Sequence, residues 1–456
     1  MKEKVSSALT NLKSALNKGH DRSVKAKKNI FASFIIKGCN IAISLVLVPL
    51  TIHYVNPTQY GIWLTLSSII GWFAFFDIGF GNGLRNKFAE AIARNDHQLA
   101  RIYLSTTYAI LGIIILCLLV IFLIINPFLN WTSILNTPAS MAAELSTLAI
   151  LVFVFFCLQF LLQLITTIIT ANQQPAKASF FNFLGSLFSL TVIFILTKTT
   201  SGSLINLALS LGFTPVLVLT ASSIWFYTHE YKKYAPSIKF VNFSYARGLM
   251  SLGLKFFIIQ IATVVLYETS NLIIAQLFGP AQVTPYNVAY KYFGIIPMVM
   301  GIFMTPFWSA ITEAWVKHDF GWIKSTMKKL QMLWLVLSVI TIGMLLASNF
   351  IYKLWVGKNL HVPLSISVAM ASYVIINAWN GIYSQFLNGV GKIKLQLYVA
   401  MAGTVINIPL AVFLGNNIGI YGVVLSTTII SILPAVISPI QYNRIINNKA
   451  QGIWVQ

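Results

Sequence analysis

The chain has 456 residues, of which 57% are hydrophobic and only 9% are charged, and its formal net charge is +21. Soluble domains contain roughly 25% charged residues, so this composition excludes an ordinary soluble globular protein. The basic residues form no stripe interleaved with aromatic side chains but lie between long apolar runs, a pattern typical of a membrane protein. We therefore expect the lipid bilayer, and no nucleic acid, as a partner.

The first segment, residues 1–29, holds eight Lys and Arg residues. Val5, Leu9, Leu12 and Leu16 fall at helical spacing, which predicts an amphipathic helix lying on the cytoplasmic membrane surface. No apolar core with a small-residue cleavage site precedes the basic cluster, so we expect no cleaved signal peptide. Anionic lipid is the favoured partner of this tail, and nucleic acid is the less favoured alternative.

Twelve apolar runs follow, each long enough to cross a bilayer. They lie near residues 30–54, 60–82, 106–127, 142–170, 179–197, 203–227, 249–277, 286–311, 330–351, 362–386, 395–414 and 417–440. This pattern predicts an all-α polytopic membrane protein of about 12 transmembrane helices. Its six-span lobes would cover residues 30–227 and 249–441, with a charged cytoplasmic linker at 228–248 and a cytoplasmic tail at 442–456.

The distribution of basic residues predicts the orientation. With a cytoplasmic N-terminus, the inner segments collect 25 Lys and Arg residues, whereas the outer loops collect only Lys198, Lys353 and Lys358. Cytoplasmic segments carry the excess of Lys and Arg in membrane proteins, so both termini are expected in the cytoplasm. No outer loop is long enough for a folded external domain, so the helical bundle must carry the function.

A shift of 223 positions aligns two halves of the chain without a gap. Residues 56–59 fall on residues 279–282, and the charged segment 90–101 falls on 313–324. Internal duplication of this kind is common among transporters. We interpret the two charged segments as solvated cytoplasmic helices that could serve as equivalent gating levers.

Charged and glycine residues meet at the end of the second apolar run. Gly79, Gly81 and Gly83 lack the strand and helix context of a phosphate loop, so they predict a bend or a close helix approach, and a hinge in a transporter. Asp77 and Arg85 lie about two helical turns apart and should share one helix face. They form either a structural pair or the polar mouth of a cavity on the cytoplasmic side.

Four further charged residues lie within apolar runs. Lys37 and Lys255 sit at similar inner-leaflet depth in the first span of each half, where they could snorkel or bind an anionic headgroup. Glu268 and Lys291 both fall toward the outer side, and an ion pair is the favoured interpretation. Glu268 could instead serve as a proton or sodium site.

No pattern in the sequence indicates a metal, a cofactor or a disulfide framework. Cys39, Cys117 and Cys157 all lie inside apolar runs and are expected to act as small hydrophobic residues. The six histidines are scattered and have no companion residues at metal-ligand spacing.

Two stretches carry a family resemblance. YGIWLTLSSIIGWFAFFDIGFGNGLRNKFAEA at residues 60–91 resembles the second-span signature of bacterial O-antigen flippases, which export polysaccharides. FLNGVGKIKLQ at 386–396 is similar to their connection between the tenth and eleventh spans. These proteins share a superfamily with multidrug extruders and lipid II flippases, and the resemblance implies two six-helix lobes around a central cavity.

The resemblance also implies a function in the bacterial inner membrane. The substrate would be an undecaprenyl-pyrophosphate-linked oligosaccharide, moved from the cytoplasmic to the periplasmic leaflet by alternating access. Other polysaccharide-assembly membrane proteins are candidate partners, and H⁺ or Na⁺ are candidate coupling ions. The expected substrate-binding residues are Lys37, Lys255, Arg85 and Lys291, and the expected ion-coupling residues are Asp77 and Glu268.

Two other functions remain open from the sequence. A multidrug or organic-cation antiporter on the same scaffold should place net negative charge in its cavity, whereas the lysines within spans outnumber or balance the acids here. A membrane enzyme, such as a polysaccharide polymerase or a polyprenyl transferase, would need a large external loop or an acidic metal-binding cluster. The chain has only ten Asp and Glu residues, so a transporter is expected rather than an enzyme.

Overall fold

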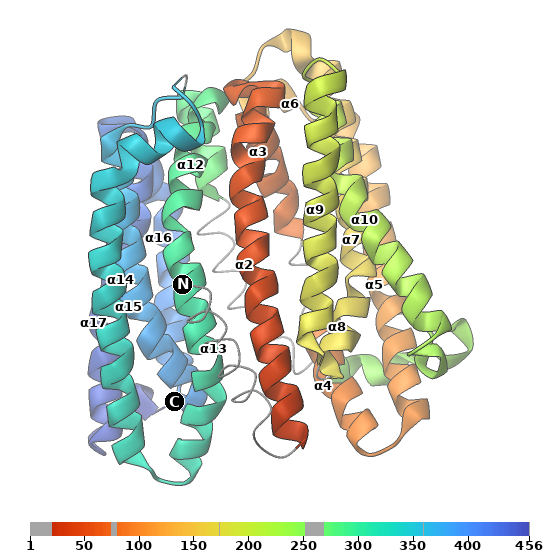
Figure 1. The fold of residues 1–456 in the computed structure, drawn as a ribbon, viewed down its shortest axis with the longest axis vertical. Helices are drawn as coiled ribbons and strands as arrows, with labels where there is room; N and C mark the ends of the chain where they lie inside the picture. The colour runs from red at the N-terminus through yellow and green to blue at the C-terminus, as the bar shows by residue number, and fades with distance from the viewer. Residues whose placement is uncertain (1–20, 74–79, 173, 251–268, 359, 456) are drawn as a thin grey trace, which may run out of the picture.

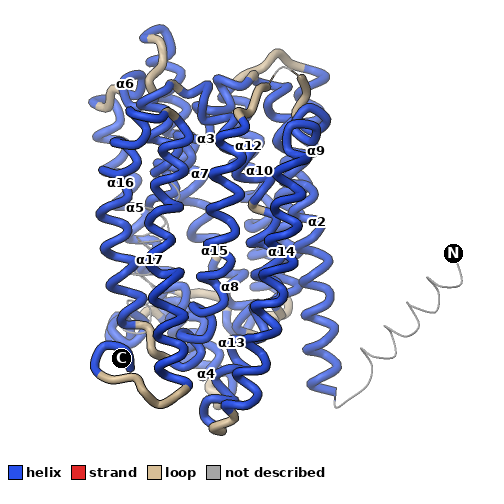
Figure 2. Tube along the Cα trace, turned by 90° about the vertical axis from the view of Figure 1, so that its left-hand side faces the viewer, coloured by secondary structure: helices blue, strands red, loops and turns tan. Residues whose placement is uncertain are grey.

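The computed structural model describes residues 21–73, 80–172, 174–250, 269–358 and 360–455. Within these ranges every regular element is a helix. Figure 1 shows two bundles side by side, which we call the first lobe (α2 to α10) and the second lobe (the described residues from 269 onward, which include α12 to α17). The axes of the long helices of both lobes are roughly parallel to one another, as Figure 2 shows from the side.

The first lobe contains nine α-helices and two short 3-10 helices in the described residues. They are α2 (Asp21–Val55), α3 (Pro57–Gly71), α4 (Phe80–Ala93), α5 (His97–Ile125), η2 (Asn126–Phe128), α6 (Trp131–Leu135), η3 (Ala139–Met141), α7 (Ala142–Leu162), α8 (Leu164–Ala171), α9 (Pro175–Thr199) and α10 (Leu204–Thr228).

The second lobe begins, in the described residues, with a short apolar helix at Thr269–Phe278. It continues with η7 (Pro280–Gln282), α12 (Val283–Phe293), α13 (Ile295–Val316), α14 (Phe320–Trp355), α15 (Leu364–Val390), α16 (Lys394–Ile418), α17 (Ile420–Ile446) and η8 (Gly452–Val455).

The predicted membrane fold is confirmed. Within the described ranges, nine helices are long and apolar enough to cross a membrane. Two further predicted spans, 60–82 and 249–277, include residues outside the described ranges. The predicted span 286–311 runs through α12 and α13, which are separated at Gly294. The exact lobe boundaries at 227 and 249 remain predictions.

The first pair of repeated segments forms two turns of the same conformation. Asn56 has φ 95° and ψ 162°, and its counterpart Gly279 has φ 85° and ψ 158°. A proline follows each of them and opens the next helix. Positive φ is accessible to glycine and, less readily, to asparagine, so both copies carry a residue that the turn tolerates.

The second pair of repeated segments shares a backbone conformation and a helix-capping hydrogen bond. Asn95 and His318 have φ 59° and 56°, and the next residue, Asp96 or Asp319, accepts a hydrogen bond from the backbone amide three positions on, at 2.9 Å in each copy. The segments 90–101 and 313–324 are therefore helix–turn–helix connections and not the continuous helices that we expected. A left-handed residue ends the first helix, and the aspartate caps the second.

These charged turns lie together at one end of the molecule, which we call the basic end; the α4–α5 and α13–α14 turns are at the bottom of Figure 1. The linker after α10 packs there against α5. Arg101 Nε donates to the Ala235 carbonyl at 2.9 Å, and its guanidinium lies 4.2 Å from the Phe240 ring centroid. The linker contains η4 (Lys232–Tyr234), η5 (Ile238–Phe240) and η6 (Phe243–Tyr245).

The two lobes meet at the opposite end, which we call the closed end. There α3 packs against η7 and α12, so the repeated turns lie against each other. Thr284 Oγ1 donates to the Pro57 carbonyl at 2.6 Å. Gly61 allows this approach, because a Cβ at that position would overlap the Pro280 carbonyl.

Candidate functional site

Two adjoining cavities lie between α2 of the first lobe and α12 and α13 of the second. Their volumes are about 420 and 600 Å³. Both are lined by Ile41, Ser44, Pro297 and Met298, so they lie directly beside each other. We call the two cavities together the inter-lobe cleft.

One face of α2 supplies polar groups to the cleft. Lys37, Asn40 and Ser44 all line it, and their spacing of three and four residues places them on the same side of the helix. Lys37 is exposed. Ser186 of α9 also lines it, so the first-lobe wall of the cleft carries one cation and three neutral hydrogen-bonding groups.

The second lobe supplies another lysine. Lys291 of α12 is partly buried and lines the cleft beside Tyr290, with Tyr373 and Asn377 of α15 on the same cavity wall. Among the described lining residues there are two lysines and no carboxylate. Whether Glu268 pairs with Lys291, as expected, lies outside the described residues. Positive charge on the described walls of a partly enclosed space favours an anionic ligand.

Several predicted site residues cannot be placed in the cleft. Lys255, Asp77, Glu268 and Gly79 lie outside the described residues. Arg85 is exposed on α4, which packs against α5 and α8, and it is not among the residues that line the two cavities.

The remaining glycines of the predicted hinge lie in the first turn of α4. Gly83 is buried, and a Cβ there would overlap the backbone carbonyl of Leu249. Gly83 therefore permits the close helix approach that was one of the two expected roles. The hinge role of Gly81 and Gly83 stays a prediction.

Sequence reasoning missed six polar or aromatic residues of the cleft, namely Asn40, Ser44, Ser186, Tyr290, Tyr373 and Asn377. A signal for the first two was available, because they continue the helical face of Lys37 within an apolar run. The residues of α15 could not be found this way, since nothing in the sequence states which helix faces α12.

A buried polar chain joins the lobes on the side of the cleft toward the closed end. Asn271 Nδ2 donates to Ser68 Oγ at 2.8 Å, and Asn287 Nδ2 donates to Asn271 Oδ1 at 2.7 Å. All three side chains are at most 7% exposed. Neutral groups that satisfy each other in this way can lie in the membrane without the cost of a buried charge.

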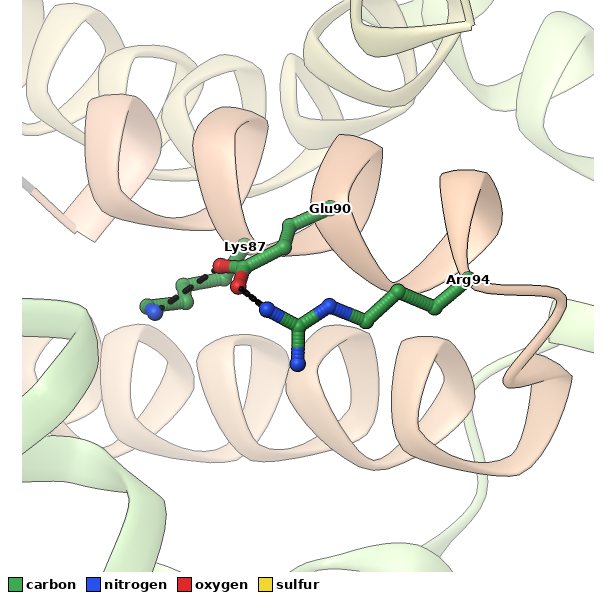
Figure 3. Close-up of polar contacts among 3 residues, drawn as sticks. All are labelled: Lys87, Glu90 and Arg94. Carbon is green, nitrogen blue, oxygen red and sulfur yellow. Dashed lines mark hydrogen bonds and ion pairs between the residues drawn. The ribbon is translucent and has the colours of Figure 1, made fainter.

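The basic end carries its charge differently. Glu90 accepts from Lys87 Nζ at 3.0 Å and from Arg94 Nη2 at 2.6 Å, as Figure 3 shows. The hydrogen bond from Lys87, with the positive charges of Lys87 and Arg94, lowers the pKa of the Glu90 carboxyl below its ordinary value. No cluster of three or more His, Cys, Asp or Glu residues that could hold a metal occurs within the described ranges.

The family models match the chain in two overlapping regions. The model for "Polysaccharide biosynthesis protein" matches residues 26–312, which is more than half of the chain, and the MatE model matches residues 256–413. A provisionally named O-antigen export protein of Yersinia pseudotuberculosis is 22% identical over 74% of this chain and 76% of its own length. A provisionally named O-antigen transporter of Salmonella typhi is 22% identical over 86% of this chain and 90% of its own.

Two solved structures with the same fold are described as multidrug resistance transporters. The inward-facing conformation of a multidrug resistance MATE family transporter of the MOP superfamily superimposes with a TM-score of 0.75 at 12% identity, covering 92% of this chain and 98% of the other. The outward-facing conformation of a MATE family transporter of the same superfamily gives a TM-score of 0.65 at 14% identity, over 95% and 98%. These matches show a shared fold and no more.

The expected resemblance to polysaccharide exporters is thus confirmed, and so is the expectation of a transporter rather than an enzyme, since the curated relatives are named as export proteins or transporters. The family model that matches residues 26–312 covers the first lobe except for the first five residues of α2, and it covers the cleft-lining residues of α12 and α13. The chain belongs to the polysaccharide biosynthesis protein family, built on the fold of the MATE multidrug transporters.

Proposed function

We propose that this protein moves a lipid-linked oligosaccharide across the bacterial inner membrane and that the inter-lobe cleft receives its diphosphate. The single observation that carries the proposal is the pair of lysines, Lys37 and Lys291, that line one cleft from opposite lobes. Lysine is a strong point-charge partner for phosphate oxygens. The neutral amide, hydroxyl and phenol groups nearby suit the hydroxyl-rich sugar.

The membrane itself supports such a path. A lipid tail can stay in hydrocarbon while the sugar and diphosphate pass through a polar cleft, which avoids the cost of bare charge in the bilayer. An inside-negative potential favours outward movement of an anion by about 2.3 kcal/mol per charge per 100 mV. Coupling to H⁺ or Na⁺ through Asp77 or Glu268, and an anion-binding role for Lys255 and Arg85, belong to the same proposal.

The topology follows from charge. The basic end would face the cytoplasm, with both termini there, because the inner segments hold 25 Lys and Arg residues against three in the outer loops. Hydrogen bonds between the lobes at the closed end would then shut the periplasmic side. The cleft would load from the cytoplasmic leaflet, and the lobes would rock to release the cargo.

Complementation of a flippase-deficient strain tests the proposal. Lys37→Ala and Lys291→Ala should each abolish surface polysaccharide at near-normal protein abundance, and the corresponding Arg variants should retain part of it, because arginine keeps the charge and changes the geometry. Lys353→Ala is the matched control, since Lys353 is exposed at the far end of α14 and does not line the cleft. Full complementation by the double alanine variant would refute the diphosphate site.

The MATE fold makes an organic-cation antiporter the second candidate. Such a protein should carry acid in its cavity, and the described lining carries two lysines instead. Efflux of a cationic dye from a drug-sensitive strain, together with failure to restore surface polysaccharide, would favour the antiporter.

A further inference from the structure

A proline in α2 leaves one backbone carbonyl of that helix without its usual partner. Pro49 lies inside the helix and has no N–H to donate to the carbonyl of Leu45, four residues earlier. The indole nitrogen of Trp355 donates to this carbonyl at 2.7 Å. Trp355 is the last residue of α14, so the donor belongs to the second lobe and the acceptor to the first.

The same arrangement occurs once more, inside a single lobe. Pro439 of α17 leaves the Ala435 carbonyl without its helical donor, and Trp379 Nε1 of α15 donates to that carbonyl at 3.1 Å. Both α15 and α17 belong to the second lobe, where they pack closely. In the part of the chain that the structure describes, two contacts of this kind therefore occur, and only the first of them crosses between the lobes.

The hydrogen bond between Trp355 and the Leu45 carbonyl, which joins the two lobes, lies between two cavities. Leu45 lines the inter-lobe cleft beside Lys291. Pro49, one turn further along α2, lines a second cavity of about 600 Å³ at the closed end, together with Val356, the neighbour of Trp355. The turn of α2 from Leu45 to Pro49 therefore separates the cleft from the outer cavity.

We infer that Trp355 is a positioning residue that keeps the closed end shut by donating to the carbonyl that Pro49 leaves free. When the lobes separate at this end, Trp355 leaves with α14 and the Leu45 carbonyl loses its donor. The loss of this hydrogen bond raises the free energy of the open arrangement relative to the closed one. The inference concerns the equilibrium between closed and open states and holds for any cargo.

Distances between spin labels across the closed end test this inference in lipid nanodiscs. The native cysteines are first replaced by serine, and labels are attached at Lys198→Cys and Lys358→Cys, two exposed positions at the end of α9 and in the loop after α14. Trp355→Phe keeps an aromatic ring and removes the N–H. It should raise the ratio of long to short distances about tenfold, which corresponds to about 1.4 kcal/mol.

Pro49→Ala supplies the second arm. It restores an amide hydrogen for the Leu45 carbonyl in both states, so the open state no longer carries an unpaired group and the ratio should also rise. In the double variant the carbonyl is already satisfied, so Trp355→Phe should add nothing to Pro49→Ala. Trp379→Phe is the matched control and should leave the distances unchanged, because both of its partners lie in one lobe.

Three results would overturn the inference: an unchanged ratio in Trp355→Phe, full additivity in the double variant, or an equal shift in Trp379→Phe. If Trp355→Phe fails to reach the membrane as a folded protein, Pro49→Ala decides alone. An unchanged ratio of long to short distances in that variant rejects the proposed role of Trp355. The distances are measured without transport, so this outcome is independent of the lysine complementation result.

Discussion

The two ends of the molecule are held by different kinds of contact. At the closed end, neutral hydrogen bonds run between the lobes, from Thr284 to the Pro57 carbonyl and from Asn271 to Ser68. At the basic end, the caps, the Glu90 ion pairs and the Arg101 contact to the linker join segments of the first lobe or of one turn. The first set must break if the lobes rock, and the second set need not.

This difference has an energetic reason. A neutral hydrogen bond contributes a net of about 0.5–1.5 kcal/mol, so several can be exchanged during a transport cycle. The Glu90 ion pairs are exposed and join residues only three or four positions apart, so they contribute little to stability and do not hold the lobes together. Substitutions at the closed end should therefore change the equilibrium between lobe arrangements, and substitutions at the basic end should change stability alone.

The largest expected effect comes from Gly61→Ala at the closed end. The new Cβ would overlap the Pro280 carbonyl, so closure should be destabilised by about 1–3 kcal/mol. The spin-label distances described above should shift toward the open arrangement. Gly71→Ala is the control in the same helix, because a Cβ there meets no atom within 4 Å. If Gly61→Ala and Gly71→Ala gave the same spin-label distances, contacts at the closed end would not control the lobe arrangement.

An intermediate effect is expected from the two helix caps at the basic end. Asp96→Ala and Asp319→Ala should each lower the free energy of unfolding by about 1 kcal/mol, because the amide of Leu99 or Trp322 loses its acceptor. The losses should be equal and additive, since the turns have the same geometry and lie in different lobes. Thermal unfolding measures the loss, and Asn variants should recover most of it. A change in lobe distances would contradict a purely local role.

The smallest effect is expected for Glu90→Gln. Because folding lowers the pKa of Glu90, its ion pairs contribute stability above the unfolded pKa, and that contribution disappears as the pH falls through the folded pKa. Melting temperatures of wild type and variant should differ slightly at neutral pH and low salt, and should converge in acid or in high salt. A difference that persists in acid would mean that Glu90 acts through packing instead of charge.

Much of the fold was predictable because the bilayer imposes simple rules. Apolar runs of sufficient length predicted the spans, and the shift of 223 positions predicted that the chain repeats itself. The repeat proved accurate at single residues, since Asn56 matches Gly279 and Asn95 matches His318 in backbone conformation. Turn geometry depends on local residue types, so a sequence comparison could find it.

The site was only half predictable. Depth in the membrane suggested that Lys37 should be paired with Lys255, whereas the structure brings Lys37 into one cleft with Lys291, and Lys255 lies outside the described residues. Periodicity gives the depth and the face of a residue within its own helix. It does not state which other helix packs against that face.

The contact between Trp355 and Leu45 shows the same division most clearly. The sequence alone determined that the Leu45 carbonyl lacks a helical donor, because a proline follows it at the fourth position. Only the tertiary structure decided that the donor is an indole 310 positions away in the other lobe. A helix break is a property of covalent geometry, whereas the partner that fills it depends on how two lobes pack, and that packing is a sum of many weak contacts spread over the whole chain.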